Sequence, residues 1–289
     1  MRSEFTAITF LFLLALTASA SLPQFLVPNF SDLTVKTRRT TDDQHVTEEA
    51  LYLKGPRERR ESALVGKNLS KSITITQCDQ RLRVSMNDKE KTYVSFPIED
   101  WSERIKRARP IPAEQLAGVD VNVTIDSVDT GERRQFGNYT ARRVKTTTKV
   151  EPGPGAVTPP SLTEGDGWYI DLLGLGCQDS RSVSFGWLHA SSGKQDRTVL
   201  KRLGTAPRGY PLEETTHRTE AGRASVSKVE LLEFSETPLD ASLFELPAGY
   251  RPALRNPYGN YDMTKPATLA NRLQAYWDVW RAWVRHWFL

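Results

Sequence analysis

The sequence predicts a mainly β protein of the α+β class, with an antiparallel sheet and one helix at the C-terminus. Three observations predict this class. Apolar and polar residues alternate with period two along most of the 289 residues, as in half-buried strands. The expected strands follow one another without long helices between them, which favours antiparallel pairing. Only the last segment repeats with a period near 3.6 over more than a few residues.

At least eight strands are expected, and the clearest of them lies near residue 120. Val119, Val121, Val123 and Ile125 alternate there with polar residues. A turn at 129–131 and a second strand from 139 to about 150 complete a long hairpin. The other expected strands share the same alternation, and they cover residues 33–37, 52–53, 73–76, 82–86, 93–96, 167–172 and 226–234.

The remaining body segments are less regular. Short helices are expected at 101–107 and 112–116. Residues 151–160, which read EPGPGAVTPP, are too rich in Pro and Gly for a helix or a sheet interior. They predict an exposed loop, with a domain linker as the alternative. Residues 191–220 are polar and charged, and their pattern predicts no definite element, with helical turns as the alternative.

Residues 1–20 have the features of a secretory signal peptide. Arg2 precedes an apolar run at 7–16, and Ala18-Ser19-Ala20 is a small-x-small cleavage site. The alternative is an uncleaved anchor helix, but the apolar run is short for one. We expect cleavage near Ala20 and a periplasmic or secreted protein.

Cys78 and Cys177 are the only two cysteines, and in an exported protein we expect them to form a disulfide. Closing a loop of roughly a hundred residues would stabilise the fold by about 4 to 5 kcal/mol. Two separate buried thiols or a metal pair are the alternatives. Neither cysteine has a second ligand at a metal-binding spacing, so no metal site is expected.

Charge is concentrated at the C-terminus. The chain has a formal net charge of +4, and residues 251–289 contain six basic residues against two acidic ones. The body is therefore neutral, which argues against a nucleic-acid-binding domain. A basic extension permits contact with an anionic surface.

No motif for catalysis or cofactor binding is found. The sequence has no GxSxG, no HExxH and no Gly-rich phosphate loop, and its four histidines are scattered. His189 is near Cys177 in the sequence, which would suit a catalytic Cys–His pair. A cysteine that is oxidised to a disulfide cannot act as a nucleophile, however. We expect a protein that is not an enzyme, without catalytic residues or cofactors. A hydrolase with an unfamiliar carboxylate site is the alternative to this expectation.

The segment 267–288 predicts an amphipathic helix, because it lacks Pro and Gly and its apolar residues share one face. Arg281 and Arg285 lie largely elsewhere. Three interpretations are open: packing on the open face of the sheet, an interfacial membrane anchor, or docking to a partner protein. The residues expected to make the membrane or partner contact are Trp277, Trp280, Trp283, Val284, Trp287, Arg281 and Arg285.

Several short motifs carry a resemblance to a known group of proteins. They are Tyr52-Leu-Lys-Gly with the basic residues at 57–60, Ile75-Thr-Gln-Cys-Asp79, Lys91-Thr-Tyr93, Gly137-Asn-Tyr-Thr-Ala141 and Leu243-Phe-Glu-Leu-Pro-Ala-Gly-Tyr250. In this order they resemble uncharacterised exported bacterial proteins, which are similar in turn to the LolA-like periplasmic lipoprotein carriers. The resemblance covers roughly residues 30 to 250, so we expect a domain over 21–250 and a Trp-rich extension over 251–289.

The resemblance implies a curved antiparallel sheet that forms an incomplete barrel, with short helices over its concave side. Such a sheet needs a lid, a ligand or a membrane to keep an apolar inner face dry. The implied function is binding of a lipid or a lipidated protein, and the alternative is a structural or interaction module of the cell envelope with a solid core. The residues expected to line the ligand site are Val121, Val123, Ile125, Ile73 and Ile75.

Overall fold

A computed structural model describes most of the body of the chain and the C-terminal helix. The described residues are 32–43, 45–66, 71–98, 119–172, 196–204, 206, 209–255 and 260–288, without the side chains after Arg281. The expected signal peptide and the two short helices at 101–107 and 112–116 lie outside these residues.

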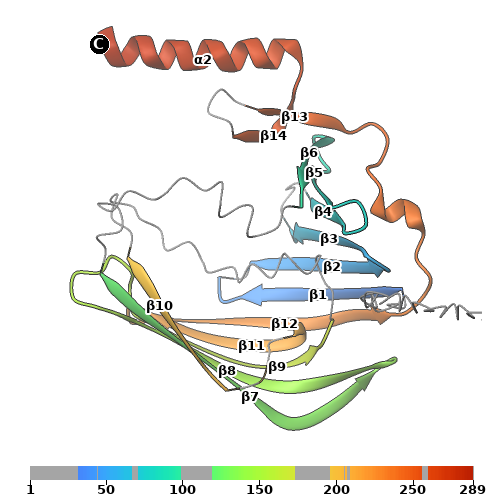
Figure 1. Ribbon diagram of the computed structural model, residues 1–289, viewed down its shortest axis with the longest axis vertical. Helices are drawn as coiled ribbons and strands as arrows, with labels where there is room; N and C mark the ends of the chain where they lie inside the picture. Colours follow the sequence, from blue (N-terminus) through green and yellow to red (C-terminus); the bar gives the residue numbers. More distant parts are fainter. Residues whose placement is uncertain are drawn as a thin grey trace, which may run out of the picture.

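The described chain is mostly β, and its strands form one open sheet (Figure 1). From edge to edge the order is β10-β7-β8-β9-β11-β12-β1-β2-β3-β4-β5-β6-β13-β14. The strands are β1 (Leu33–Thr41), β2 (Val46–Lys54), β3 (Arg57–Leu64), β4 (Ser72–Gln77), β5 (Leu82–Asn87), β6 (Thr92–Pro97), β7 (Asp120–Phe136), β8 (Tyr139–Pro152), β9 (Ser161–Ile170), β10 (Arg197–Leu203), β11 (Tyr210–Glu220), β12 (Arg223–Ser235), β13 (Arg251–Arg255) and β14 (Tyr261–Pro266). The prediction of a mainly β protein is confirmed.

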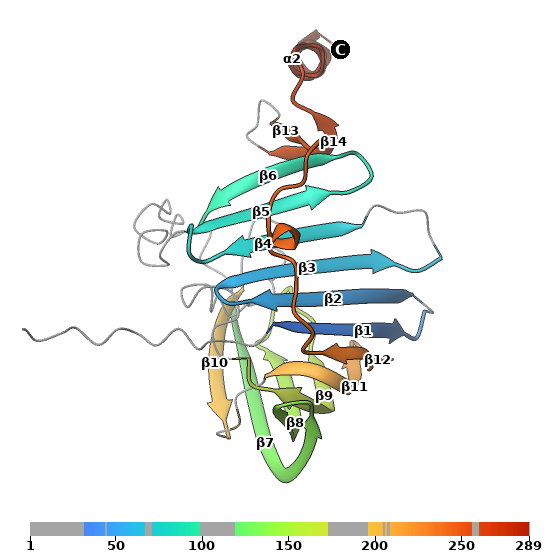
Figure 2. The same ribbon diagram turned by 90° about the vertical axis from the view of Figure 1, so that its right-hand side faces the viewer.

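Two neighbouring strand pairs are parallel, which corrects the prediction of a purely antiparallel sheet. They are β10 with β7 and β13 with β6. Parallel neighbours need a crossover connection. Residues 236–250 are the last part of the connection from β6 to β13, because they cross the sheet from β12 to β13 (Figure 2). The period-two pattern identifies strands but not the direction in which they enter a sheet.

The long hairpin forms, but its turn is not at 129–131. The chain reverses at Gly137 and Asn138, where Gly137 has a φ of 52° and Asn138 donates two hydrogen bonds to Glu236. The expected turn is a bulge inside β7, where residues 130–132 lie opposite Arg143 alone. The Asp129 carboxylate accepts a hydrogen bond from the Gly131 N–H at 2.9 Å. A bulge and a tight turn use the same residue types, which explains the error.

The polar segment 191–220, for which the sequence predicted no element, contains strands β10 and β11. Residues 153–160 connect β8 with β9, which are neighbours in the same sheet. The Pro- and Gly-rich segment is therefore a connection between paired strands.

One face of β3–β5 is covered by the segment that links β12 to β13. This covering segment, residues 236–250, includes the 3-10 helix η3 (Ala241–Phe244), which crosses in front of β4 in Figure 2. Phe244 is fully buried in a cluster with Ile73, Ile75, Val84 and Met86. The Gln77 side chain donates to the Phe244 carbonyl at 2.8 Å, so polar contacts also hold the segment.

The chain ends in helix α2 (Leu269–Phe288), as predicted. The helix follows β14 directly and lies beyond the β13–β14 hairpin, away from β1–β12, in Figures 1 and 2. The Thr268 hydroxyl accepts a hydrogen bond from the Asn271 N–H at 3.2 Å, as an N-cap residue does.

Candidate apolar binding face

The candidate site is the face of the sheet that carries Leu33 and Val35 on β1 and Leu51 and Leu53 on β2. Leu33 is paired with Leu53, and Val35 with Leu51. Paired residues project on the same side of a sheet, and so do residues two apart along a strand. We call this side the inner face. All four side chains are buried.

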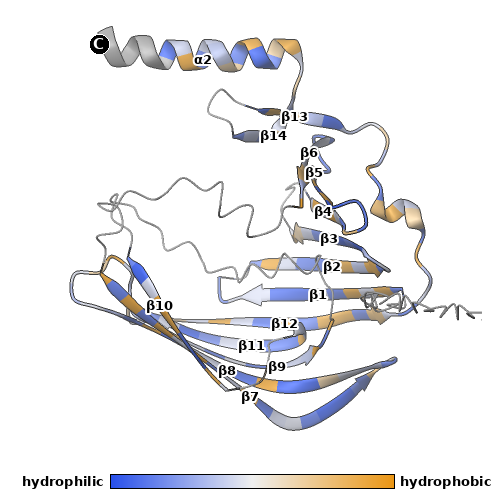
Figure 3. Cartoon of the chain, in the orientation of Figure 1, coloured by the Kyte–Doolittle hydropathy of each residue, from blue (hydrophilic) through white to orange (hydrophobic). Residues whose placement is uncertain are grey.

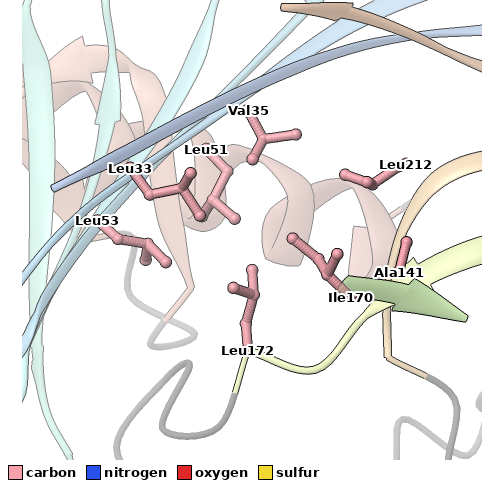
Figure 4. Packing of buried hydrophobic residues seen from close by; sticks show 8 residues of the cluster. All are labelled: Leu33, Val35, Leu51, Leu53, Ala141, Ile170, Leu172 and Leu212. Atoms are coloured by element: carbon pink, nitrogen blue, oxygen red, sulfur yellow. The ribbon is translucent and has the colours of Figure 1, made fainter. Parts of the chain in front are cut away.

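A second wall closes over these four residues. Ile170, Leu172, Leu212 and Ala141 point toward them in Figure 4 and belong to the same buried cluster. They come from β8, β9, β11 and the residues that follow β9. At this corner the inner face is packed protein.

The inner face continues across the sheet to β7. Arg39 on β1 is paired with Val229 on β12, and Val229 with Glu214 on β11. Glu214 is paired in turn with Gly167 on β9, and Gly167 with Val144 on β8. On β8, Thr148 and Val150 project on the same side as Val144, because even numbers of residues separate them. They are paired with Ile125 and Val123 on β7. Val121, Val123 and Ile125 therefore project on the inner face. Val121 is buried, whereas Val123 and Ile125 are half-buried.

Ile73 and Ile75 lie on the opposite face. Ile75 is paired with Arg59 on β3. The next residue of β3, Arg60, is paired with Leu51. Adjacent residues of a strand point to opposite sides, so Ile75 faces away from Leu51. Both isoleucines pack against Phe244 beneath the covering segment. The structure thus does not bring the five expected lining residues together, because alternation alone does not show which side of each strand is shared.

Two glycines allow a close approach between β9 and its neighbours. A Cβ atom on Gly167 would lie 2.5 Å from the Glu213 carbonyl oxygen, and one on Gly165 would lie 2.7 Å from Thr146 Oγ1. Next to them the buried Glu214 carboxylate accepts a hydrogen bond from the Tyr169 hydroxyl at 2.8 Å. Tyr169 and Val144 form a small buried cluster with Ala206.

Two polar side chains of β3, which the sequence did not predict as site residues, border the leucine cluster. Glu58 and Arg60 are paired with Leu53 and Leu51, and they form an ion pair with each other. The Arg60 guanidinium lies 5.8 Å from the centre of the Tyr210 ring. Burial raises the pKa of the Tyr210 hydroxyl. Burial opposes the charge of Arg60, yet the hydrogen bond to Glu58 leaves its pKa raised.

Within the described part of the chain, one carboxylate oxygen of Glu58, Oε2, has no hydrogen-bond partner, although only 7% of the residue is exposed. A buried polar atom without a partner is costly, and such atoms are rare in folded proteins. A ligand with a hydrogen-bond donor would satisfy it. The only sequence signal for a site at Glu58 is that polar and apolar residues do not alternate along β3, which reads RERRESAL.

Two hollows in the described part of the structure are open and are lined mostly by polar residues. The larger, of about 930 Å³, lies over β8, β9, β11 and β12. Its lining includes Arg143, Trp168 and Glu213, which are opposite one another on the face away from Val144. Arg143 forms two hydrogen bonds of 2.8 Å with Asp166, which is the main reason its pKa is raised. The smaller hollow, of about 610 Å³, is lined mostly by Thr, Ser and Asp residues. Neither is an apolar cavity.

The other predicted site residues fall into two groups. Trp277, Trp280 and Arg281 are exposed on α2. The side chains of Trp283, Val284, Arg285 and Trp287 lie outside the described part of the helix.

Cys78 is in the turn between β4 and β5, whereas Cys177 is outside the described residues. The disulfide between them therefore stays a prediction.

No model of a known protein family matches the chain, and no curated protein sequence does so either.

Proposed function

We propose that this protein is an exported, non-enzymatic binding protein that holds a lipid, or the acyl chain of a lipidated protein, on the inner face of a curved sheet. In this proposal the sheet acts as an incomplete barrel, and the concave side is the inner face. The signal peptide expected at 1–20 places the protein in the periplasm or outside the cell. The resemblance to the LolA-like carriers supports the same class of ligand.

One observation carries the proposal: the apolar inner face extends beyond its packed corner. Leu33, Val35 and Leu51 are fully buried against a second wall. Val123 and Ile125, on the same face at β7, are half-buried, and so is Leu200 on β10, which is paired with Val123. Partly exposed apolar side chains on the same face as a closed core form a surface on which an acyl chain gains by burial.

The polar group at β3 suits the other end of an amphiphile. Arg60 and Tyr210 offer a cation and a hydroxyl at the border of the leucine cluster, and Glu58 Oε2 offers an acceptor that has no partner among the described residues. A few polar groups at the margin of an apolar surface fix the orientation of a ligand. Lipids have this combination of a long apolar part and a polar head.

The test is native mass spectrometry of the purified protein, together with lipid analysis of its organic extract. We expect bound lipid in the wild-type protein and its loss in Val123→Asp, which places a charge on the inner face. Asn122→Asp is the matched control, because the neighbouring side chain is exposed on the other face. It should keep the lipid. A wild-type protein without any bound lipid, or a Val123→Asp variant that retains it, would contradict the proposal.

The second candidate is a structural or interaction module of the cell envelope with a solid core. The full burial of Leu33, Val35, Leu51 and Leu53 favours it. In that case the purified protein holds no lipid, and Val123→Asp lowers the melting temperature without changing any bound mass.

A further inference from the structure

The apolar face of α2 points to solvent. Leu269, Leu273, Tyr276, Trp277 and Trp280 lie on one side of the helix, and each of them is between 46% and 74% exposed. Asn271, Ala275 and Val279, which follow each other at intervals of four on another side, are half-buried. Figure 3 shows hydrophobic positions on the first turns of the helix, which lies beyond the β13–β14 hairpin. The helix is therefore not a lid with its apolar face against the sheet.

The exposed aromatic rings are organised. Trp277 and Trp280 stack with their ring centres 4.8 Å apart and an angle of 19° between the planes. The Arg281 guanidinium lies 5.3 Å from the centre of the Trp277 ring. Trp rings prefer a boundary between apolar matter and water, and arginine can cover apolar surface while its charge stays in water.

The charges around this face have a pattern as well. Arg272 and Arg281 lie on opposite flanks of the apolar side at helical spacing. The acidic residue of the described helix, Asp278, is on the far side, where it accepts a hydrogen bond from Gln274 at 2.8 Å. On the adjoining hairpin, Arg251 and Arg255 are exposed. A flat apolar stripe with basic flanks complements a surface that is apolar inside and negatively charged at its boundary.

We propose that α2 docks lengthwise on the surface of a membrane that contains anionic phospholipids. Trp277, Trp280 and Leu273 enter the boundary between headgroups and acyl chains, and Arg272 and Arg281 contact the headgroups. No helix in the described chain is long and apolar enough to cross a membrane, so the contact is peripheral. This proposal does not depend on lipid binding at the inner face.

The experiment measures binding of the full-length protein to phosphatidylcholine vesicles with and without phosphatidylglycerol, by co-sedimentation and by tryptophan emission. We expect binding to the anionic vesicles, a shift of the emission to shorter wavelength, and weaker binding as salt increases. The double variant Trp277→Gln/Trp280→Gln should bind at least about tenfold more weakly. Gln274→Ser, on the polar side of the same helix, should bind as the wild type does.

A second double variant separates the charges from the rings. Arg272→Gln/Arg281→Gln should keep weak binding but lose most of the preference for anionic vesicles. No binding at low salt, or binding that is unchanged in the tryptophan variant, would overturn the proposal. A wild-type dimer in light scattering that the tryptophan variant abolishes, without vesicle binding, would overturn it in favour of a second copy of this chain as the partner. Bound lipid in native mass spectrometry is a separate measurement, so failure here leaves the inner-face proposal standing.

Discussion

Two segments that follow β12 carry large apolar side chains, and they differ in whether those side chains are buried. The covering segment, residues 236–250, buries Phe244 in the sheet and is fixed by hydrogen bonds to β3 and β4. Helix α2 carries Trp277 and Trp280 and leaves them exposed. Apolar composition alone does not determine burial. A segment is buried where the sheet offers a matching apolar surface and polar partners for its backbone.

The contrast begins in the strands beneath. Ile73, Ile75, Val84 and Met86 form an apolar surface on the side of β4 and β5 that Phe244 covers. Arg59 borders this surface and donates to the Leu243 carbonyl at 3.0 Å. In the described chain α2 contacts the short strand β13, and Trp277 and Trp280 stay exposed there. The three predictions below test this contrast.

The largest effect is expected at Phe244. Phe244→Ala removes a fully buried ring from the cluster under the covering segment, and such a change costs about 3 to 5 kcal/mol of unfolding free energy. Denaturant titration measures it. Leu246→Ala, two residues on and exposed, is the matched control and should change the free energy by less than about 0.5 kcal/mol. Equal effects of the two variants would show that the covering segment is not part of the core.

A smaller effect is expected at the end of the same segment. The Tyr250 hydroxyl donates to Asp88 Oδ1 at 2.6 Å. Burial and this hydrogen bond raise the pKa of Tyr250 to about 12. The hydrogen bonds from Lys91 and Tyr250 lower the pKa of Asp88. Since the folded state favours protonated Tyr250, this contribution is complete below about pH 10. It is lost as the pH rises toward 12.

Tyr250→Phe should therefore cost about 1 kcal/mol at neutral pH, the contribution of one hydrogen bond. The difference from the wild type should shrink between pH 10 and pH 12 in denaturant titrations at stepped pH. Asp88→Ala, which removes the acceptor, serves as the second arm of a double-mutant cycle. In that background Tyr250→Phe should have a smaller effect. Additive effects of the two changes would mean that the hydrogen bond contributes nothing to stability.

The sequence predicted the class of the fold because period-two alternation is a local property. It showed the strands at 73–76 and 82–86 and the helix at the C-terminus to within a few residues. It did not show that Ile75 and Val123 face opposite sides, because this depends on the register of the strands between them. It also missed Glu58 and Arg60, since charged residues at inward positions look like surface residues until pairing places them beside Leu51 and Leu53.

The position of α2 shows the same limit. The heptad-like spacing of Leu273, Trp277 and Trp280 predicted which residues share a face, and they do share one. Whether that face is covered depends on what lies opposite, which a local pattern does not contain. The alternative of a lid on the sheet was reasonable because most amphipathic helices pack on their own domain.

The smallest effect is expected from removing α2. A chain that ends at Thr268 loses the exposed rings of Trp277 and Trp280 but none of the buried clusters under the covering segment or at the inner face. Because exposed apolar groups gain little from the fold, the free energy of unfolding should change by less than about 0.5 kcal/mol. Denaturant titration of the truncated and full-length proteins side by side measures this. A loss as large as that of Phe244→Ala would mean that α2 is buried against the protein in solution, and the contrast between the two segments would then be wrong.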